Sequence, residues 1–482
     1  MSGRVLGFVI SDKLSVENNN TKGFVKMINT GFAREIITPE RQLPLMGYLN
    51  PRFNCGVLDD LFVKVLLFDD GNTLGGIVSY DLCAVTFALI NTVRQELQTQ
   101  NIDVMDNLLF CCTHTHTGPY TLNSVNQNYS PEYMDMLGRQ TLRAFIRARA
   151  NLSPSSLWYG SVEDNPYAFN RRYYMKDGRV VTNPGKMNPD IVRAEGEVDR
   201  GIGIVKLTKN DMTEAVIVNI CNHSDTIGGN YISADWPGRM EKAIQQAFGY
   251  DVPVITLIGA SGNINHFDVA SRKNQTCYRE AERIGKGYAK IVLKGIGRLQ
   301  HWEGDHFELV KKTFEIIGRT IPTAELNSAR ELMAVAVTEN DQALTSEDIV
   351  KGSNAIRRCF AAQLLAFHER EEGKVRNFNL LIFKFGPELA IASVPGEPFT
   401  EVGIAIKRHA GRKLTMVVAH ANGKAGYLPL PECFDRGGYE ILPVLSGGAP
   451  PNTALRLQNE VCRMLDICRT LSQDSMIISN DK

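Results

Sequence analysis

The sequence has no long hydrophobic run among its 482 residues. Its longest mainly apolar stretches, such as Val252–Ala260, have the length of a strand, whereas a membrane-spanning helix needs about 20 apolar residues. We therefore expect no integral membrane segment. The apolar stretch Leu6–Ile10 near the N-terminus is also too short for the core of a signal peptide, so we expect a cytoplasmic protein.

An excess of charge of either sign is missing as well, because 53 Lys and Arg residues balance 53 Asp and Glu residues. A protein that binds nucleic acid through phosphate contacts normally carries a basic excess, so we expect no nucleic acid partner. The 43% of hydrophobic residues is near the globular average and excludes a disordered or fibrous chain. We expect a small-molecule substrate, and the composition does not indicate the oligomeric state.

Cysteine is scarce and scattered. The ten cysteines contain no CxxC pair, and their small share of the chain argues against a disulfide scaffold. We interpret each cysteine as a small buried apolar residue in a reduced protein.

Short apolar runs of β type alternate with helical patterns along the chain. This order predicts an α/β fold with mixed sheet layers and flanking helices. The turn Gly386–Glu388 predicts a hairpin, so the sheet should not be purely parallel. The expected strands are Phe62–Phe68, Gly76–Leu82, Leu108–Cys112, Ala215–Cys221, Pro253–Ile258, Leu380–Phe385, Leu389–Val394 and Leu414–His420, and the expected helices are Thr86–Thr99, Pro131–Asn151, Arg239–Phe248 and Tyr278–Arg298.

One segment, of about residues 306–375, differs from the rest because it is rich in charge and helical in pattern. We expect a helical insertion within a single large catalytic domain, 1–482. The insertion either caps a functional site or forms a plain structural layer, and the sequence favours neither.

Four of the nine histidines follow predicted strands, and so does Glu397. His114 and His116 form a His-x-His pair, which places both rings on one face of an extended segment. Together with His223 and His266 they supply the ligand types of a divalent transition metal. Each signal is weak alone, since a single histidine is more often a packed polar residue. Their shared position at strand ends favours a metal site, because ligands bind outside the carboxyl ends of strands in α/β sheets.

The order of the motifs resembles the catalytic domain of the neutral, non-lysosomal ceramidases. Thr113–Pro119, with the sequence THTHTGP, is similar to the family's THTHSGP segment. Asn170–Tyr173 resembles its Asn-Arg-Ser segment, and Val394–Thr400 contains its PGEPFT-like motif. Tyr427 and Tyr439 resemble the family's paired tyrosines.

The resemblance implies a zinc-dependent hydrolase of the amidohydrolase type, which cleaves an amide (C–N) or ester bond with metal-activated water. Bound zinc can lower the pKa of its water to about 7. The family's zinc ligands correspond here to His114, His223, Glu397 and Tyr427.

The resemblance also implies catalytic roles. His116 corresponds to the acid/base, Tyr439 to the group that stabilises the tetrahedral intermediate, and Arg171 to an active-site arginine. We expect Asn170, Asn265 and His266 to bind substrate, and Asp81, Asp225 and Asp235 are candidates to orient the histidines.

The sequence departs from the family's pattern in three respects, one of which is that no secretion signal is expected. The family's Gly-Asp-Val-Ser-Pro segment appears as Gly262–His266, with Asn265 at the serine position. The family's C-terminal immunoglobulin-like domain is also not expected. We therefore predict a small, polar, water-soluble amide or ester as substrate, with long-chain ceramide a poor one.

Three alternatives stay open. Ser261 lies in a segment that partly resembles a GxSxG nucleophile elbow, which would make the protein a serine hydrolase. The pair Arg171 and Arg172 would suit a lyase or isomerase that acts on a sugar-like compound. A non-catalytic binding protein is the third, although it would need neither His116 nor Tyr439.

Overall fold

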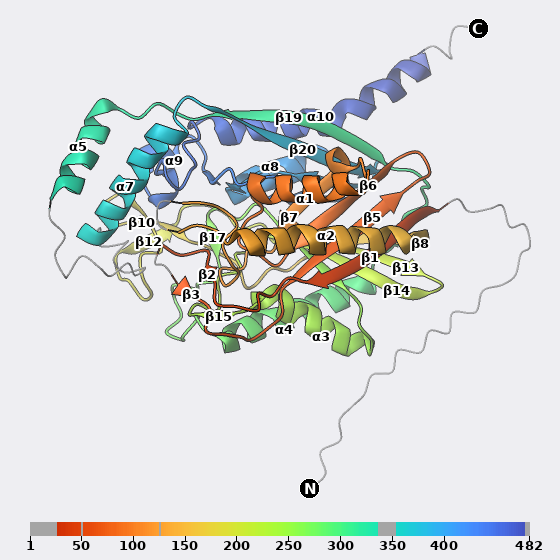
Figure 1. Ribbon diagram of the computed structural model, residues 1–482. Helices are drawn as coiled ribbons and strands as arrows, with labels where there is room; N and C mark the ends of the chain where they lie inside the picture. The colour runs from red at the N-terminus through yellow and green to blue at the C-terminus, as the bar shows by residue number, and fades with distance from the viewer. Residues whose placement is uncertain (1–26, 50–51, 125–126, 336–352, 478–482) are drawn as a thin grey trace, which may run out of the picture.

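The computed structural model describes residues 27–49, 52–124, 127–335 and 353–477, and these form layers (Figure 1). Helices cover one face of a large mixed sheet, a smaller sheet packs on its other face, and further helices cover the smaller sheet. The predicted α/β fold with mixed sheets and flanking helices is confirmed. Within the described ranges, no helix is both long enough and apolar enough to span a membrane.

The large sheet contains, in spatial order, β16 (Val254–Ile258), β14 (Met212–Ile220), β13 (Gly201–Lys209), β8 (Ser153–Glu163), β1 (Ile28–Ile36), β5 (Phe62–Asp69), β6 (Leu74–Tyr80) and β7 (Leu108–Cys112). β18 (Gln300–His301) pairs with β8. The pairs β14–β16 and β6–β7 at the two sides of the sheet are parallel, and the pairs between them are antiparallel.

Burial on both faces explains the continuous apolar runs. In β5, Val63 and Val65 face the helices, whereas Leu66 and Phe68 face the smaller sheet. All four side chains are fully buried, and each contributes roughly 1.5–3 kcal/mol by leaving water. A strand that is covered on both faces loses the alternation of apolar and polar residues.

The smaller sheet has the order β19 (Glu308–Ile317), β20 (Val375–Phe385), β21 (Leu389–Ser393) and β23 (Leu414–Val418). β20 and β21 form the predicted hairpin, in which Phe385 pairs with Leu389. β21 and β23 are parallel. Phe383, Phe385 and Met416 pack against the large sheet and form the core between the two sheets.

The helices lie on the two outer faces (Figure 1). α1 (Phe87–Thr99), α2 (Pro131–Ala150), α3 (Asp235–Phe248) and α4 (Tyr278–Ile296) pack on the large sheet, as predicted. α8 (Thr400–Ala410) and α10 (Thr453–Ile477) pack on the smaller sheet. Ser130 caps α2 by accepting a hydrogen bond from the Tyr133 N–H.

Short elements complete the described chain and lie mostly in the loops around the strand ends. They are β2 (Pro44–Leu45), β3 (Arg52–Phe53), β4 (Gly56–Val57), η1 (Met105–Asn107), β9 (Phe169–Asn170), β10 (Arg172–Met175), β11 (Val180–Thr182), β12 (Ile191–Ala194), β15 (Tyr231–Ile232), β17 (Ile264–Asn265), β22 (Glu397–Pro398), β24 (Tyr427–Leu428), α9 (Cys433–Arg436) and η3 (Tyr439–Ile441).

The predicted helical insertion of about residues 306–375 begins with a strand, β19, and among its described residues the helices are α5 (Thr323–Ala334) and α7 (Asn354–Arg370). β19 pairs with β20 along its whole length and exposes a charged face that includes Lys311 and Glu315. The charges hid its alternation, in which Phe314 and Ile316 point into the core. Residues 336–352 lie outside the described part of the chain.

Candidate active site and metal centre

The histidines and the carboxylate predicted as metal ligands come together at the ends of the strands. His114 and His116 follow β7, and His223 follows β14 in the same sheet. Glu397 comes after β21, in the smaller sheet. Each of these strands belongs to a parallel pair, and the loops beyond the carboxyl ends of such strands are where α/β proteins bind ligands.

Backbone hydrogen bonds join the strand ends of the two sheets at this point. The Ala419 N–H donates to the Ile258 carbonyl at 2.8 Å, and the Asn422 N–H donates to the Phe110 carbonyl at 2.8 Å. These bonds fix the loop after β23 against β16 and β7. The site is therefore supported by rigid elements of both sheets rather than by free loops.

Three ligand atoms of the predicted metal site converge. The Glu397 Oε2 atom lies 3.7 Å from the His114 Nε2 atom and 3.5 Å from the His223 Nε2 atom. Zinc bonds of about 2.0–2.2 Å in tetrahedral geometry hold neighbouring ligand atoms about 3.3–3.6 Å apart. The spacing thus fits a metal ion of this size.

The hydrogen bonding of these atoms gives a second test of the fit. Both ring nitrogens of His223 lack a hydrogen-bond partner among the described residues, and so does the Oε2 atom of Glu397. Both side chains are buried, and polar atoms left unpaired in a protein interior are costly. A metal ion would satisfy the Nε2 and Oε2 atoms together.

Tyr427, the fourth predicted ligand, is adjacent to this group. β22 and β24 pair in parallel, with Glu397 opposite Tyr427, and residues directly opposite each other on paired strands have neighbouring side chains. Burial raises the pKa of Tyr427 well above its ordinary value, so its phenol is neutral in the protein without metal.

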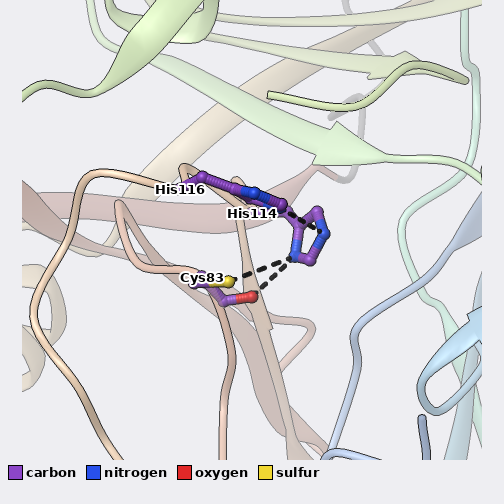
Figure 2. A group of neighbouring side chains, drawn as sticks. All are labelled: Cys83, His114 and His116. Carbon is purple, nitrogen blue, oxygen red and sulfur yellow. Dashed lines mark hydrogen bonds between the residues drawn. The ribbon is translucent and has the colours of Figure 1, made fainter. Parts of the chain in front are cut away.

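The ring of His114 is held so that its Nε2 atom is free for a metal. His114 Nδ1 lies 2.7 Å from the carbonyl oxygen of Cys83 (Figure 2), and a proton on Nδ1 leaves the lone pair on Nε2. The Cys83 sulfur lies 3.9 Å from the same nitrogen. Burial raises the pKa of the Cys83 thiol, and a protonated thiol is a poor metal ligand.

His116 lies beside the group formed by His114, His223 and Glu397 rather than within it. Its Nε2 atom lies 3.2 Å from His114 Nε2 (Figure 2), and its Nδ1 atom lies 3.4 Å from Asp225 Oδ1. The Tyr48 hydroxyl donates a short hydrogen bond to the same carboxylate. Burial, with a further contribution from His114, lowers the pKa of His116 well below its ordinary value. A neutral imidazole beside the metal position can accept a proton.

Of the three aspartates proposed to orient histidines, Asp225 contacts one. Asp81 accepts a hydrogen bond from the Phe62 N–H. Asp235 accepts from the N–H groups of Thr226 and Ile227 and fixes the loop after His223. Asp81 and Asp235 therefore support the backbone rather than an imidazole.

The paired tyrosines and Arg171 form another wall of the site. The rings of Tyr427 and Tyr439 are 5.9 Å apart, and the Arg171 guanidinium lies 5.0 and 5.2 Å from their centroids. The Arg171 Nε atom donates to Glu440 at 3.2 Å. Glu440 is fully buried and also accepts from Arg172 at 2.7 Å. This network holds Arg171 in place, and Arg172 serves as structural support.

A cavity of about 520 Å³ contains the site. Its walls include His114, His116, His223, Glu397 and both tyrosines, together with Asn265. Side chains of α7, among them Phe360 and Phe367, close one side. Whether the helical segment serves as a cap or as a structural layer stays a prediction, with α7 beside the cavity.

Comparison with solved structures identifies this fold. The structure matches neutral ceramidase from Pseudomonas aeruginosa with a TM-score of 0.66 and 16% sequence identity, over 91% of this chain and 74% of that one. It matches a ceramidase complexed with C2 with a TM-score of 0.67 and 18% identity, over 92% of this chain and 76% of that one. The fold is similar to that of neutral ceramidase structures.

The sequence comparisons agree with this assignment over a shorter range. Neutral ceramidase A of Dictyostelium discoideum is 24% identical over 210 residues, which are 39% of this chain and 29% of that protein. Neutral ceramidase B of the same organism is 24% identical over 209 residues, with the same coverage. The match therefore spans less than a third of these relatives. No protein-family model matches the chain.

Two residues predicted to bind substrate lie away from the cavity of this neutral ceramidase-like fold. Asn170 and His266 are not among the described residues that line it. The Asn170 side chain accepts from the Arg172 N–H at 3.0 Å. The His266 Nε2 atom lies 2.7 Å from the Gln275 carbonyl. Both bonds hold loops in place, and a role of Asn170 and His266 in substrate binding stays a prediction.

Asn265 does line the cavity, with its Nδ2 atom donating to Asn183 at 2.7 Å. Ser261, the nucleophile of the serine-hydrolase alternative, is buried and is not one of the described lining residues. A serine that no substrate reaches cannot act as a nucleophile, so the structure does not favour that alternative.

The structure adds a histidine that the sequence interpretation passed over. His420 follows β23, lines the cavity and stacks on His114 with ring centroids 3.9 Å apart. It was treated only as the end of an apolar strand. Its one available signal was its position, since it precedes a Gly-containing polar loop as the other site histidines do.

Gly396, directly before Glu397, provides a test of the ligand geometry. Its φ is +63°, and a Cβ atom there would lie 2.4 Å from the Gly426 carbonyl. Gly396→Ala is expected to cost about 1–2 kcal/mol for the left-handed backbone and to displace Glu397, lowering metal affinity about 10- to 100-fold. The control is Gly178→Ala, which shares a positive φ but has nothing within 4 Å. Metal titrations that give equal affinities for both variants would contradict the placement of Glu397.

Proposed function

We propose that this protein is a metal-dependent hydrolase that cleaves an amide bond of a small substrate, with zinc as the metal and water as the nucleophile. The observation that carries the proposal is the convergence of His114, His223 and Glu397, whose ligand atoms lie within 4.8 Å of one another at the wall of the cavity. The similar proteins are named ceramidases, and ceramide is an amide.

His114, His223, Glu397 and Tyr427 would hold the metal, which when bound polarises a carbonyl and acidifies water. His116 is the residue placed to move protons. Its Nε2 atom lies 3.2 Å from His114 Nε2, and burial keeps the ring neutral. It can accept the proton of the attacking water and return it to the leaving nitrogen, while Asp225 orients the ring.

Tyr439 and Arg171 would stabilise the charge that develops on the carbonyl oxygen. Burial raises the pKa of Tyr439, so its hydroxyl stays protonated and can donate a hydrogen bond. Arg171 lies over both tyrosine rings and is fixed by Glu440. Preorganised donors of this kind act where the oxyanion forms, and they need no rearrangement during the reaction.

The cavity supports a substrate of limited size. Its volume of about 520 Å³ lies within the range of pockets for drug-sized ligands, about 300–1,000 Å³. Its walls combine apolar side chains such as Leu49, Val85 and Phe360 with polar groups such as Asn183 and Asn265. We propose a water-soluble amide with a short acyl chain, in keeping with the polar substrate that the sequence predicts.

Metal removal tests the proposal. Protein purified without added metal should contain about one zinc ion per chain, lose amide hydrolysis on treatment with a chelator, and regain it on addition of zinc. The substrate panel contains short N-acyl amides, the corresponding esters and long-chain ceramide. Ser261→Ala, measured in parallel, should retain turnover. Full activity of metal-free protein, or a Ser261→Ala variant without turnover, would overturn the proposal.

A further inference from the structure

We propose that the cavity contains an anion subsite, formed by Arg376 and Lys424 with Arg370 at its rim and His420 at its inner end, and that the substrate carries a carboxylate as well as the scissile amide. All four residues line the cavity. The inference deepens the proposed amide hydrolysis and rests on it for the identity of the reaction.

His420 shows that the inner end of the subsite lacks a partner within the protein. Its side chain is 6% exposed, and the buried Nε2 atom has no hydrogen-bond partner among the described residues. A buried polar atom without a partner costs free energy unless a ligand satisfies it. Stacking on His114 places His420 directly beside the proposed metal position.

Arg376 and the loop that carries Lys424 have a shared neighbour, Phe378. The Arg376 guanidinium lies 5.7 Å from the centroid of the Phe378 ring. The loop that carries Lys424 packs on the same ring, because a Cβ atom on Gly423 would lie 3.1 Å from Phe378 Cδ1. This loop begins at His420. Arg376 and the loop that carries His420 and Lys424 therefore lie beside the same ring, and all three residues line the cavity.

Arg370 reaches this wall from α7. Phe367, one turn earlier in the helix, contacts Gly448, where a Cβ atom would lie 1.9 Å from its ring. The preceding residue, Gly447, accepts a short hydrogen bond from Arg376 Nη2. Helix α7 thus brings a third cation toward the two that the smaller sheet supplies.

The charges on this wall are not balanced by the protein. Arg370, Arg376 and Lys424 have no ion pair within 4 Å in the described parts of the chain, whereas Arg171 and Arg172 share Glu440. Two carboxylates that line the cavity lie near these groups: Glu371 interacts with Arg376 at longer range, and Glu397 interacts with His420. The wall therefore carries a net positive charge, and a guanidinium with free donors favours a carboxylate.

Matched substrate pairs test the subsite. One series carries the carboxylate on the amine half, as N-hexanoyl glycine and N-hexanoyl β-alanine, and the other carries it on the acyl half, as the butylamides of glutaric and adipic acid. Each compound is compared with its neutral carboxamide. Because a charged hydrogen bond is worth about 1.5–3 kcal/mol, kcat/KM for at least one carboxylate should exceed that of its carboxamide about 10-fold or more.

Variants locate the effect on the wall. In the Arg376→Gln, Lys424→Gln double variant the ratio of carboxylate to carboxamide should fall close to one. Lys374→Gln, an exposed cation near the same strand that does not line the cavity, should leave the ratio unchanged. His420→Phe, which keeps the stacked ring but removes the nitrogens, should weaken binding of a whole series about 2- to 12-fold, as the loss of one hydrogen bond does.

Equilibrium binding separates this inference from the proposed reaction. Calorimetry with metal-free protein and the same compounds needs no turnover and excludes direct binding of the carboxylate to a metal. Tighter binding of carboxylates, lost in the double variant, supports the subsite even if no amide is hydrolysed. Equal affinity or equal kcat/KM for both members of every pair overturns it, and hydrolysis of the carboxamides would then leave the proposed function standing.

Discussion

His116→Ala is expected to lower turnover by about 10²–10⁴-fold, the contribution of a proton-transfer residue, while the protein keeps its metal. His114→Ala is expected to lose both. The physical reason is the different surroundings of the two Nδ1 atoms. His114 Nδ1 faces a carbonyl oxygen at 2.7 Å, which leaves Nε2 for a metal, whereas His116 Nδ1 faces the Asp225 carboxylate.

Elemental analysis of both variants beside single-turnover rates measures this division. His301→Ala is the control, because His301 is exposed on β18 and should change neither quantity. Equal metal loss in the His114 and His116 variants would show that His116 is itself a ligand. The two Nε2 atoms are 3.2 Å apart, a distance at which both could bind one metal ion. The experiment therefore distinguishes a ligand role of His116 from a proton-transfer role.

The parts of the fold that the sequence predicts are those buried on both faces. β5, β7, β14 and β16 are continuous apolar runs because each is covered by helices on one side and by a sheet on the other. β8 was missed because its polar, partly exposed residues weaken the apolar signal. β19 was assigned to a helical segment because its exposed face is charged.

The sequence predicts residues of the site only where a side chain that can bind a metal directly follows an apolar strand. His114, His223 and Glu397 carry metal-binding groups directly after apolar strands, and the structure brings them together. The carbonyl oxygen of Cys83 orients His114, but a backbone group leaves no mark in the sequence. The burial of Glu440 between Arg171 and Arg172 joins segments that are far apart in the chain, so no local pattern could reveal it.

Tyr439→Phe is expected to lower kcat by about 10²–10³-fold, the usual cost of removing one oxyanion donor, with little change in KM or in metal content. Phenylalanine keeps the ring beside Tyr427 and Arg171, whose guanidinium lies 5.2 Å from its centroid, and removes only the hydroxyl. Because burial raises the pKa of Tyr439, that hydroxyl remains a donor over the whole neutral range.

Tyr427→Phe is the matched comparison, since both tyrosines line the cavity and both pack against Arg171. Tyr427 lies opposite Glu397 in the β22–β24 pair, so its loss should weaken metal binding, and high zinc concentrations should restore part of the rate. No zinc concentration should rescue Tyr439→Phe. Rescue of both variants by zinc would assign both hydroxyls to the metal, and the oxyanion would then depend on Arg171, which Glu440 holds from the far side.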